Sequence, residues 1–327
     1  MENIDKNKSN NYSSTKLSKY DKLISNVDTN KLTKWKNIQN DLKSKLIEYD
    51  NFKLKNNSSE FINIAGVDIT VSKFEDTKGI VGISVIRSDN FELIYEDYEL
   101  VEITEPYVPG FLAFKEVDHL LNLIKNMYNK IENKDILPDA ILVDGNGILH
   151  SNRFGLASHL GVLIDEYIIK PNNINININS INDNNLDYSN IYKNIPTIGV
   201  GKTVFAVDGI NKHTVKKLVE NNLLKAKDYV YLKGNSKSIW GAALRSTDEA
   251  YIPIYVSIGH NISLETSLNV VNKSINYRIP EPIRISDLTT RLLMKYYENI
   301  KFKAFDIKKY LSTIQRKYLY NKKIEHI

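Results

Sequence analysis

Residues 138–162 read PDAILVDGNGILHSNRFGLASHLGV, and this stretch decides the fold class. It begins with a short apolar segment, Ala140–Gly145, of the kind found in central strands buried on both faces. After a turn, Phe154–Ile164 has the pattern of a helix. A further strand is predicted at Pro196–Val200. This alternation of strand and helix predicts an α/β fold.

The segments on either side extend this pattern. Three β-rich runs, each bounded by turn or charged residues, precede the quoted stretch and predict an antiparallel meander. Apolar residues at helical spacing predict amphipathic helices. The predicted elements outside the quoted stretch are, in order, a helix at 32–49, strands at 61–71, 79–86 and 91–101, a helix at 112–131, strands at 196–200, 239–245 and 252–257, and helices at 264–272 and 285–299.

Composition divides the chain into three parts. Residues 1–55 are predicted to form a polar N-terminal extension with one helical segment, 56–299 a compact domain, and 300–327 a basic C-terminal helical extension. Residues at about 170–194 contain PNNINININSINDNN, where isoleucine and asparagine alternate as in a strand. The density of asparagine instead favours a low-complexity insertion into the domain.

The bulk composition excludes several classes of protein. Hydrophobic residues make up 42% of the 327 residues, which is enough for a sizeable core and argues against wholesale disorder. Cysteine is absent, so disulfides, zinc fingers and thiol catalysis are excluded, and any metal must have oxygen or imidazole ligands. A formal charge of +5 is too mild to identify a nucleic-acid binder by itself.

No segment indicates a membrane or secretory destination. No apolar run reaches membrane-spanning length. The N-terminal stretch MENIDKNKSNNYSSTK is polar and lacks the apolar region of a signal peptide. We therefore expect an intracellular protein of the cytoplasm, the nucleus or both, with no membrane partner.

Two aspartates stand where a charge is costly to bury. Asp68 lies inside the apolar run AGVDITV, and Asp144 closes AILVDG at the C-terminal end of its strand. A buried carboxylate needs a partner cation or hydrogen-bond donors. One interpretation is that each aspartate caps a turn, as Asp-Gly pairs do. The other is that neighbouring central strands bring both to the sheet edge where ligands bind, to hold a hard metal ion.

Six blocks resemble the signature blocks of the endonuclease V family in order and spacing. They are FINIAGVDIT (61–70), EPYVPGFLAFKE (105–116), the block quoted first, PTIGVGK (196–202), PIYVSIGH (253–260) and YRIPEPIRISD (277–287). The resemblance implies a ribonuclease H-like fold, α/β with a mixed central sheet flanked by helices, and makes 56–299 the catalytic domain. It also implies hydrolysis of a phosphodiester bond 3′ to inosine, one nucleotide beyond it, leaving a 3′-hydroxyl and a 5′-phosphate.

The resemblance assigns catalytic residues as well. Asp68, Glu116 and Asp144 look like the family's metal-binding carboxylates, expected to hold Mg²⁺ with Mn²⁺ as a substitute. Lys202 looks like the lysine near the scissile phosphate, where it would neutralise developing charge. His260 looks like the active-site histidine, which would orient or deprotonate the attacking water. By residue type alone, Glu116 would be an exposed helix residue and His260 a structural one.

Six further residues match the family's substrate-binding positions. The PYVP element (106–109) corresponds to a wedge in which the tyrosine takes the place of the displaced base by stacking. Without the resemblance it would be interpreted as a rigid turn, and the histidine at 150 as a brace for the preceding turn. The implied substrate contacts are Tyr107, Pro109, Leu112, Gly145, His150 and Gly155.

Two departures from the family's bacterial pattern bear on substrate choice. Asn146 in VDGNG stands where histidine is common, and Gly201 in GVGK stands where alanine is usual. The asparagine form resembles eukaryotic members, which favour inosine in RNA or a ribonucleotide near the cut. PYVPG nevertheless keeps a second proline that animal members commonly lack. The expected partner is inosine-containing RNA or DNA, with RNA favoured.

Two other functions remain open at this point. One is a ribonuclease H-like nuclease for flapped or branched structures, against which the wedge and the VDGNG turn argue. The other is an inactive module that binds inosine-containing RNA, against which three intact carboxylates argue. The basic tail either extends a phosphate-binding track or forms a solvated helix; its residues are Lys301, Lys303, Lys308, Lys309, Arg316, Lys317, Lys322 and Lys323.

Overall fold

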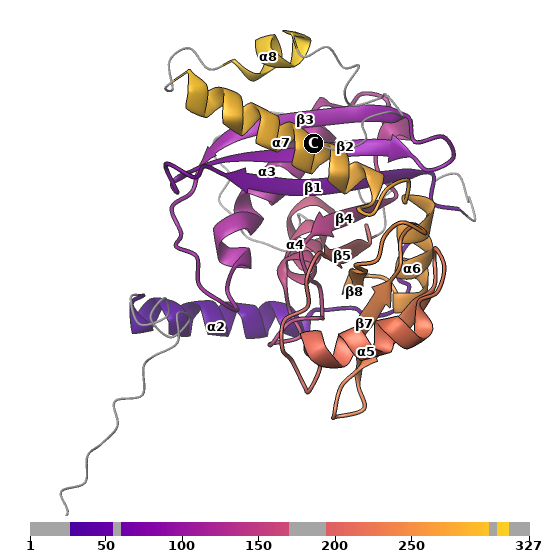
Figure 1. Cartoon of the computed structure of the whole chain (residues 1–327). Helices are drawn as coiled ribbons and strands as arrows, with labels where there is room; N and C mark the ends of the chain where they lie inside the picture. The colour runs from indigo at the N-terminus through magenta and orange to yellow at the C-terminus, as the bar shows by residue number, and fades with distance from the viewer. Residues whose placement is uncertain (1–26, 55–59, 170–193, 301–305, 314–327) are drawn as a thin grey trace, which may run out of the picture.

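A mixed sheet of eight strands organises the fold (Figure 1). The computed structural model describes residues 27–54, 60–169, 194–300 and 306–313. The strand order across the sheet is β3-β2-β1-β4-β5-β8-β7-β6. The strands are β1 (Asn63–Val71), β2 (Lys78–Arg87), β3 (Leu93–Glu102), β4 (Ala140–Asp144), β5 (Thr197–Gly201), β6 (Tyr229–Lys233), β7 (Ile239–Leu244) and β8 (Ile254–His260).

The first three strands form the predicted antiparallel meander. β1 pairs with β2, and β2 with β3, over nearly their whole lengths. Successive residues of a strand point to opposite faces of a sheet. Accordingly, Ile64 and Ala65 of β1 pack in different core clusters, and both are fully buried. This explains why β1 is apolar at consecutive positions rather than alternating.

The direction of the central strands fixes the position of the two predicted aspartates. β1, β4 and β5 run parallel, and Val67 of β1 lies beside Val143 of β4. Asp68 directly follows Val67, and Asp144 directly follows Val143, so the two aspartates lie side by side on neighbouring strands. β8 pairs antiparallel with β5 and reverses the direction of the chain. Its C-terminal end therefore lies at the sheet edge opposite to the C-terminal end of β4.

Helices cover both faces of this sheet. α3 and α4 pack on one face, where they bury Val67 and Val143. α6 and α7 cover the other, and α7 lies across β1 and β2 (Figure 1). The helices are α2 (Thr29–Ser44), α3 (Ala113–Lys130), α4 (Leu156–Ile164), α5 (Lys212–Asn222), α6 (Leu264–Lys273), α7 (Glu281–Asn299) and α8 (Ile307–Thr313), with a short 3₁₀ turn η2 (Lys134–Ile136) and a π-helical turn η3 (Asp165–Ile169).

The structure confirms the predicted strands and helices of the described residues and adds one helix and one strand, α5 and β6, besides the short turns η2 and η3. A capping box begins α5: Asn211 accepts from the backbone N–H of Thr214, and the Thr214 hydroxyl accepts from that of Asn211. β6 pairs with β7 at the edge of the sheet, where Leu232 is its one fully buried residue. An edge strand with so little burial has a weak sequence pattern, which accounts for the omission.

α2 packs against the sheet domain, although it belongs to the predicted N-terminal extension. The Trp35 ring stacks on Phe114 of α3, with centroids 5.0 Å apart and planes 11° from parallel. Gln39 is only 1% exposed. The packing therefore continues across the boundary that composition placed at residue 55.

Several predictions concern segments beyond the described residues. These are the polar head at 1–26, the insertion at 170–193 and most of the basic tail. Part of that tail is described as α8, and Tyr310 of α8 stacks on Tyr296 of α7 with ring centroids 4.0 Å apart. Within the described ranges, none of the helices combines the length and apolarity needed to cross a bilayer.

Candidate active site

Three aspartates from separate elements converge at the C-terminal end of β4. Asp68 projects from β1, Asp144 ends β4, and Asp287 lies on α7, which crosses β1. One carboxylate oxygen from each lies within 4.8 Å of the other two. The side chains are largely shielded, with 15% of Asp144 and 14% of Asp287 exposed. Such a set of oxygens could hold a metal ion, because hard divalent cations prefer carboxylate ligands.

The electrostatics of this group also fit a bound cation. Burial, followed by the charges of Asp144 and Asp287, raises the pKa of Asp68 well above its usual range. Lys202 directly follows β5, and its Nζ donates to Asp144 at 2.5 Å and lies 3.5 Å from Asp287. Burial opposes the charged form of Lys202, but the carboxylates outweigh it and raise the pKa of the ammonium. The pKa of Asp68 stays raised although the positive charge of Lys202 lowers it. An additional cation bound among the three aspartates would therefore stabilise their ionised forms.

Asp287 is the member of the group that the sequence prediction missed. It ends the YRIPEPIRISD block, so the resemblance contained a signal for it. Its helical context pointed elsewhere, because Arg291 pairs with it at 2.7 Å in the i,i+4 arrangement of ordinary surface ion pairs. Thr290 joins it to β1: the threonine hydroxyl lies 3.4 Å from Asp68 Oδ2 and 3.0 Å from the backbone carbonyl of Asp287.

Glu116 lies near the three aspartates but outside their group. It is half-buried in the first turn of α3. Burial is the main cause that raises its pKa to about 7; Lys115 opposes this shift and Asp144 adds to it. The contribution of Asp144 means that the two carboxyl groups are within electrostatic reach of each other. A carboxyl that titrates near neutral pH can take up or release a proton during a reaction.

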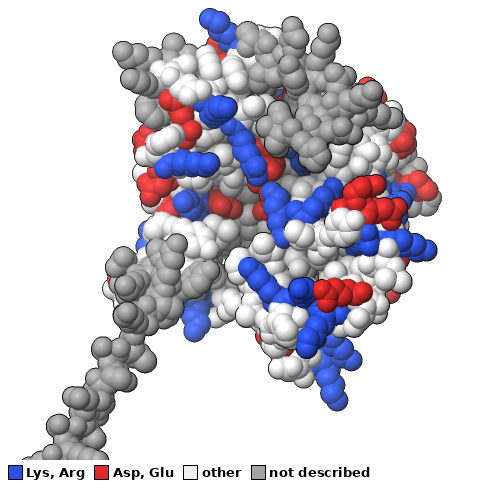
Figure 2. Space-filling model, in the orientation of Figure 1, with Lys and Arg blue, Asp and Glu red and all other residues white. Residues whose placement is uncertain are grey.

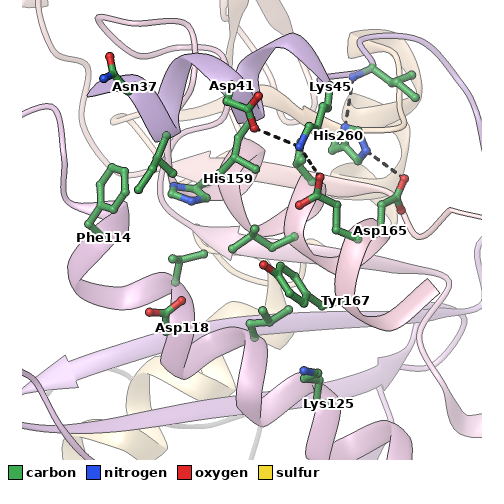
Figure 3. Close-up of a pocket in the computed structure, with 18 residues that line it drawn as sticks. Asn37, Asp41, Lys45, Phe114, Asp118, Lys125, His159, Asp165, Tyr167 and His260 are labelled. Carbon is green, nitrogen blue, oxygen red and sulfur yellow. Dashed lines mark hydrogen bonds and ion pairs between the residues drawn. The ribbon is translucent and has the colours of Figure 1, made fainter. Parts of the chain in front are cut away.

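His260 lies elsewhere, and this corrects the prediction that it acts on the attacking water. His260 pairs with Thr197 of β5, whereas Asp144 pairs with Val200 of the same strand. Thr197 and Val200 are three residues apart, and three residues of strand span about 10 Å. The His260 Nε2 lies 3.1 Å from Asp165, and its Nδ1 accepts from the backbone N–H of Ile47 at 3.2 Å (Figure 3). With 2% of its surface exposed, His260 is a structural residue at the opposite sheet edge.

A large cavity lies at that opposite edge, between α2, α3 and α4 (Figure 3). Its volume is about 1250 Å³. Lys45 on its wall pairs with Asp41 at 3.1 Å and with Glu166 at 2.7 Å, so these charges satisfy one another. Burial lowers the pKa of His159, which also lines it, to about 4. The three converging aspartates and Glu116 are not part of this cavity's wall.

A second cavity, of about 380 Å³, opens beside the aspartates and brings the predicted substrate contacts together. Two aromatic side chains that line it are partly open to solvent, Tyr107 at 42% and Phe205 at 62%. The lining includes all six predicted contacts, Tyr107, Pro109, Leu112, Gly145, His150 and Gly155, together with Asp144, Asn146, Gly201 and Lys202. We refer to it below as the base cavity.

Two of the predicted contacts shape the wall of the base cavity. The Nδ1 of His150 accepts from the backbone N–H of Asn152 at 3.3 Å, and burial lowers the pKa of His150 to about 4. The ring is therefore neutral near pH 7 and carries its proton on Nε2. A Cβ at Gly155 would lie 2.3 Å from the backbone oxygen of Asn146, so glycine is required for the two ends of the loop between β4 and α4 to approach this closely.

Basic side chains gather on the face of the molecule that carries α7. Figure 2 shows a band of lysines and arginines that crosses the middle of this face, with aspartates and glutamates beside it. α7 itself exposes Arg291 and Lys295. Positive charge beside a group of carboxylates suits a polyanionic strand that must reach a negatively charged site.

Comparison with known proteins places these observations in a family. A family model described as Endonuclease V matches residues 40–169 and 188–288. Endonuclease V of Mus musculus is 33% identical over 262 residues, which cover 80% of this chain and 68% of the relative. Endonuclease V of Homo sapiens is 32% identical over 262 residues, which cover 80% of this chain and 82% of the relative.

Solved structures show the same likeness. The catalytic domain of human Endonuclease V has a TM-score of 0.70 and 30% identity, and the match covers 84% of this chain and 100% of that chain. A Ciona intestinalis Endonuclease V, in complex with DNA containing an inosine followed by a ribo-adenosine, has a TM-score of 0.67 and 25% identity, covering 83% and 99%. This likeness confirms the expected ribonuclease H-like fold.

Proposed function

The chain belongs to the endonuclease V family and is an endonuclease, and on that premise we propose its substrate and its cut. It hydrolyses the phosphodiester bond 3′ to inosine, one nucleotide beyond it, in RNA or DNA, and leaves a 3′-hydroxyl and a 5′-phosphate. One observation carries this proposal: the base cavity combines the six predicted substrate contacts with Asp144 and Lys202 of the candidate active site.

The base cavity suits a base that has left its stack. The edge that distinguishes hypoxanthine is hidden within a helix, so the nucleotide must be turned out before it can be recognised. Tyr107 offers a partly exposed aromatic face that can stack where the base was. Gly145 and Gly155 lie in the cavity wall, where backbone groups could meet the edge of a flat ring.

Asp68, Asp144 and Asp287 would hold the metal ion, for which we propose Mg²⁺, with Mn²⁺ as a substitute. Such an ion, when bound, polarises a phosphoryl oxygen and lowers the pKa of a bound water. Lys202 already reaches two of these carboxylates, and its ammonium would neutralise charge that develops on the phosphate. Glu116 lies outside the converging group, so we assign it to the proton of the attacking water.

We further propose that a ribonucleotide next to inosine favours cleavage. Asn146 in the VDGNG turn agrees with the form that eukaryotic members carry. The Ciona intestinalis relative binds a DNA in which a ribo-adenosine follows the inosine. The 2′-hydroxyl is the group by which a protein distinguishes RNA from DNA at one position.

The test is cleavage of matched single-stranded RNA and DNA oligonucleotides, each with and without one inosine, in the presence of Mg²⁺. Cutting confined to inosine strands is expected, and the end groups of the products locate the cut. The RNA-to-DNA rate ratio, with a DNA strand carrying one ribonucleotide after inosine, decides the preferred sugar. Equal cutting of the inosine-free strands would favour a nuclease for other structures, and cutting of no strand would favour an inactive binding module.

The wedge assignment has its own test in Tyr107→Ala. Loss of a stacked aromatic ring costs about 1–3 kcal/mol per base, so cleavage of the inosine strand should fall by roughly tenfold or more. Binding to an inosine-free strand should change little, because no base is turned out there. Equal losses on the two strands would remove the wedge role. Tyr251→Ala, at a side chain that is 84% exposed and is not part of the base cavity's wall, is the matched control.

A further inference from the structure

The wedge block ends in a tight turn that fixes the direction of the chain. The backbone N–H of Phe111 donates to the carbonyl of Val108 at 2.9 Å. The two central residues of this β-turn are Pro109 and Gly110, and Gly110 has a φ of 83°. Proline followed by a residue of positive φ is typical of a type II turn. Tyr107 stands just before the turn, so whatever holds the turn also holds the ring that we propose as the wedge.

One buried glutamine joins this turn to the loop of the base cavity. Gln39 of α2 is 1% exposed, and its Nε2 donates to the carbonyl oxygens of Gly110 at 3.3 Å and of Phe154 at 3.1 Å. Its Oε1 accepts from Nδ2 of Asn152 at 2.6 Å. Phe154 and Asn152 belong to the loop between β4 and α4, which also carries His150. The carboxamide therefore connects the wedge with a loop that supplies other predicted base contacts.

The carboxamide of Gln39 has the bonding of a brace and not of a group that binds a ligand. A primary amide has two N–H donors and one acceptor oxygen. Both donors meet carbonyl oxygens, which can only accept, and the oxygen accepts from another amide. Gln39 belongs to the wall of the base cavity, but its polar atoms are already paired and almost none of its surface is exposed. Its contribution to recognition is therefore indirect, through the groups that it holds.

Other side chains of α2 hold the same block before and after the wedge. Lys31, Trp35 and Gln39 are spaced by four residues, so they lie on one face of the helix. Lys31 forms an ion pair with Glu105, which directly precedes the wedge. The Trp35 ring packs on Phe111, which closes the wedge turn, with ring centroids 5.9 Å apart. α2 thus contacts both ends of the wedge, although composition assigned this helix to the N-terminal extension.

We propose that Gln39 is a positioning residue for base recognition, which couples the wedge at Tyr107 to the base cavity through Gly110 and Phe154. The inference rests on the proposed function, because it takes Tyr107 as the wedge and the base cavity as the seat of inosine. It makes α2 a part of the recognition site. Without the carboxamide the turn and the loop lose their shared partner, and a misplacement of about 1 Å can reduce a rate by about a hundredfold.

The first test is Gln39→Met, which keeps the length of the side chain but removes its three hydrogen bonds. The kcat/KM on an inosine strand should fall by roughly tenfold or more, because the wedge and the cavity are no longer held together. Affinity for the matched adenosine strand should not change, because no base is turned out there. An unchanged kcat/KM in the folded variant would overturn the proposal.

Leu42→Ala is the matched control for this test. Leu42 is also a buried residue of α2, but it packs in the core and is not part of the base cavity's wall. The change should lower Tm and leave kcat/KM on the inosine strand at the wild-type value, at a temperature where the variants are folded. An equal loss of kcat/KM in Leu42→Ala and Gln39→Met would show that any loosening of α2 has this effect, and would refute the specific role of Gln39.

A double-mutant cycle with Tyr107→Ala separates positioning from stability. Because Gln39 acts partly through the wedge, Gln39→Met should lower kcat/KM less when Tyr107 is already replaced. Losses that simply multiply would contradict the coupling. Asn152→Ala removes only one of the three bonds, at a half-buried side chain, and serves if Gln39→Met does not fold. It should cause a smaller loss in the same direction, and no loss would again overturn the proposal.

Hydrogen exchange tests the brace without any cleavage. Backbone amides of residues 105–116 and 146–155 should exchange faster in Gln39→Met than in the wild type, and Leu42→Ala should leave both segments unchanged. This result is expected whether or not an inosine strand is cut, so it separates failure of this inference from failure of the proposed function. Unchanged exchange in Gln39→Met would overturn the brace. If the wild type cuts no strand, affinity for inosine over adenosine strands takes the place of kcat/KM, and a preference unchanged in Gln39→Met would overturn the role in recognition.

Discussion

The two ends of the parallel strands hold acids that are largely shielded from solvent but have different surroundings. At the end where β4 finishes, Asp68, Asp144 and Asp287 converge, and burial and mutual repulsion raise the pKa of Asp68. At the other end, Asp165 accepts from the side-chain N–H of Asn261 at 3.0 Å and lies 3.1 Å from His260.

The difference between the two ends lies in whether the chain itself satisfies the charge. The Oδ2 of Asp165 has partners from its own chain in Asn261 and His260, so the charge at the second end is already paired in the folded chain. The aspartates have Lys202 and the largely exposed Arg291, and Asp68 is nevertheless hard to ionise. Burial and acidity alone therefore do not mark an active site. A group that is incomplete without a ligand does.

Asp287→Asn should have the largest effect on cleavage. The change keeps the shape of the side chain but removes one of three charges that would hold the metal. Several kcal/mol of transition-state stabilisation come from the ion, so the cleavage rate should fall by roughly a thousandfold. Single-turnover cleavage of an inosine strand measures this, with strand affinity as the control. Cleavage within tenfold of the wild type would remove Asp287 from the metal group.

Lys202→Met should have the next largest effect. The variant keeps most of the apolar stem but removes the ammonium that lies 2.5 Å from Asp144. Loss of one charge-stabilising donor typically reduces a rate by about a hundredfold. Metal affinity should not decline in parallel, because a cation that repels the metal has also been removed. A loss of cleavage explained wholly by weaker metal binding would contradict the role at the phosphate.

The third prediction concerns pH and the metal ion. Burial, and then Asp144, raise the pKa of Glu116, which reaches about 7, and the pKa of Asp68 is also raised. A raised carboxyl pKa means that these groups favour the folded state when protonated, and that this contribution is lost as the pH rises through the folded pKa. Metal binding requires the ionised form of Asp68, and a negative charge on Glu116, which is within electrostatic reach of Asp144, favours a bound cation further. The increase in Tm on adding Mg²⁺ should therefore grow from pH 6 to pH 8. An increase in Tm that becomes smaller over this range would contradict the prediction.

His260→Gln should have the smallest effect on cleavage. It breaks the contacts of His260 with Asp165 and Ile47, and a disrupted buried hydrogen bond costs about 1–3 kcal/mol of stability. Tm should fall, while kcat on an inosine strand stays at the wild-type value at a temperature where both proteins are folded. A large loss of kcat in the folded variant would show that His260 takes part in the reaction. The contrast between a catalytic end and a structural end of the sheet would then be wrong.

The local sequence pattern and the family blocks were sufficient to predict most of the strands and helices and the residues that line the base cavity. The apolar run before Asp144 identified a buried strand, and the run around Asp68 identified its neighbour, because burial on both faces leaves an unmistakable composition. The blocks that carry Tyr107, His150 and Gly155 also predicted residues that the structure collects around one cavity. Each of these inferences depends on residues close in sequence or on one strand pairing.

Tertiary structure alone decided which of the remaining candidates meet. His260 follows a strand, as Asp144 does, but β8 runs antiparallel to β5, so its last residue lies at the opposite edge. Asp287 has the sequence context of an exposed helical ion pair, and only the path of α7 across β1 brings it to Asp68. The contact of Asn146, in the loop after β4, with Gly201 at the end of β5 likewise joins residues 55 positions apart. Sequence periodicity records which face of an element is buried, but not the direction of a strand or the crossing of a helix, which depend on the packing of the whole chain.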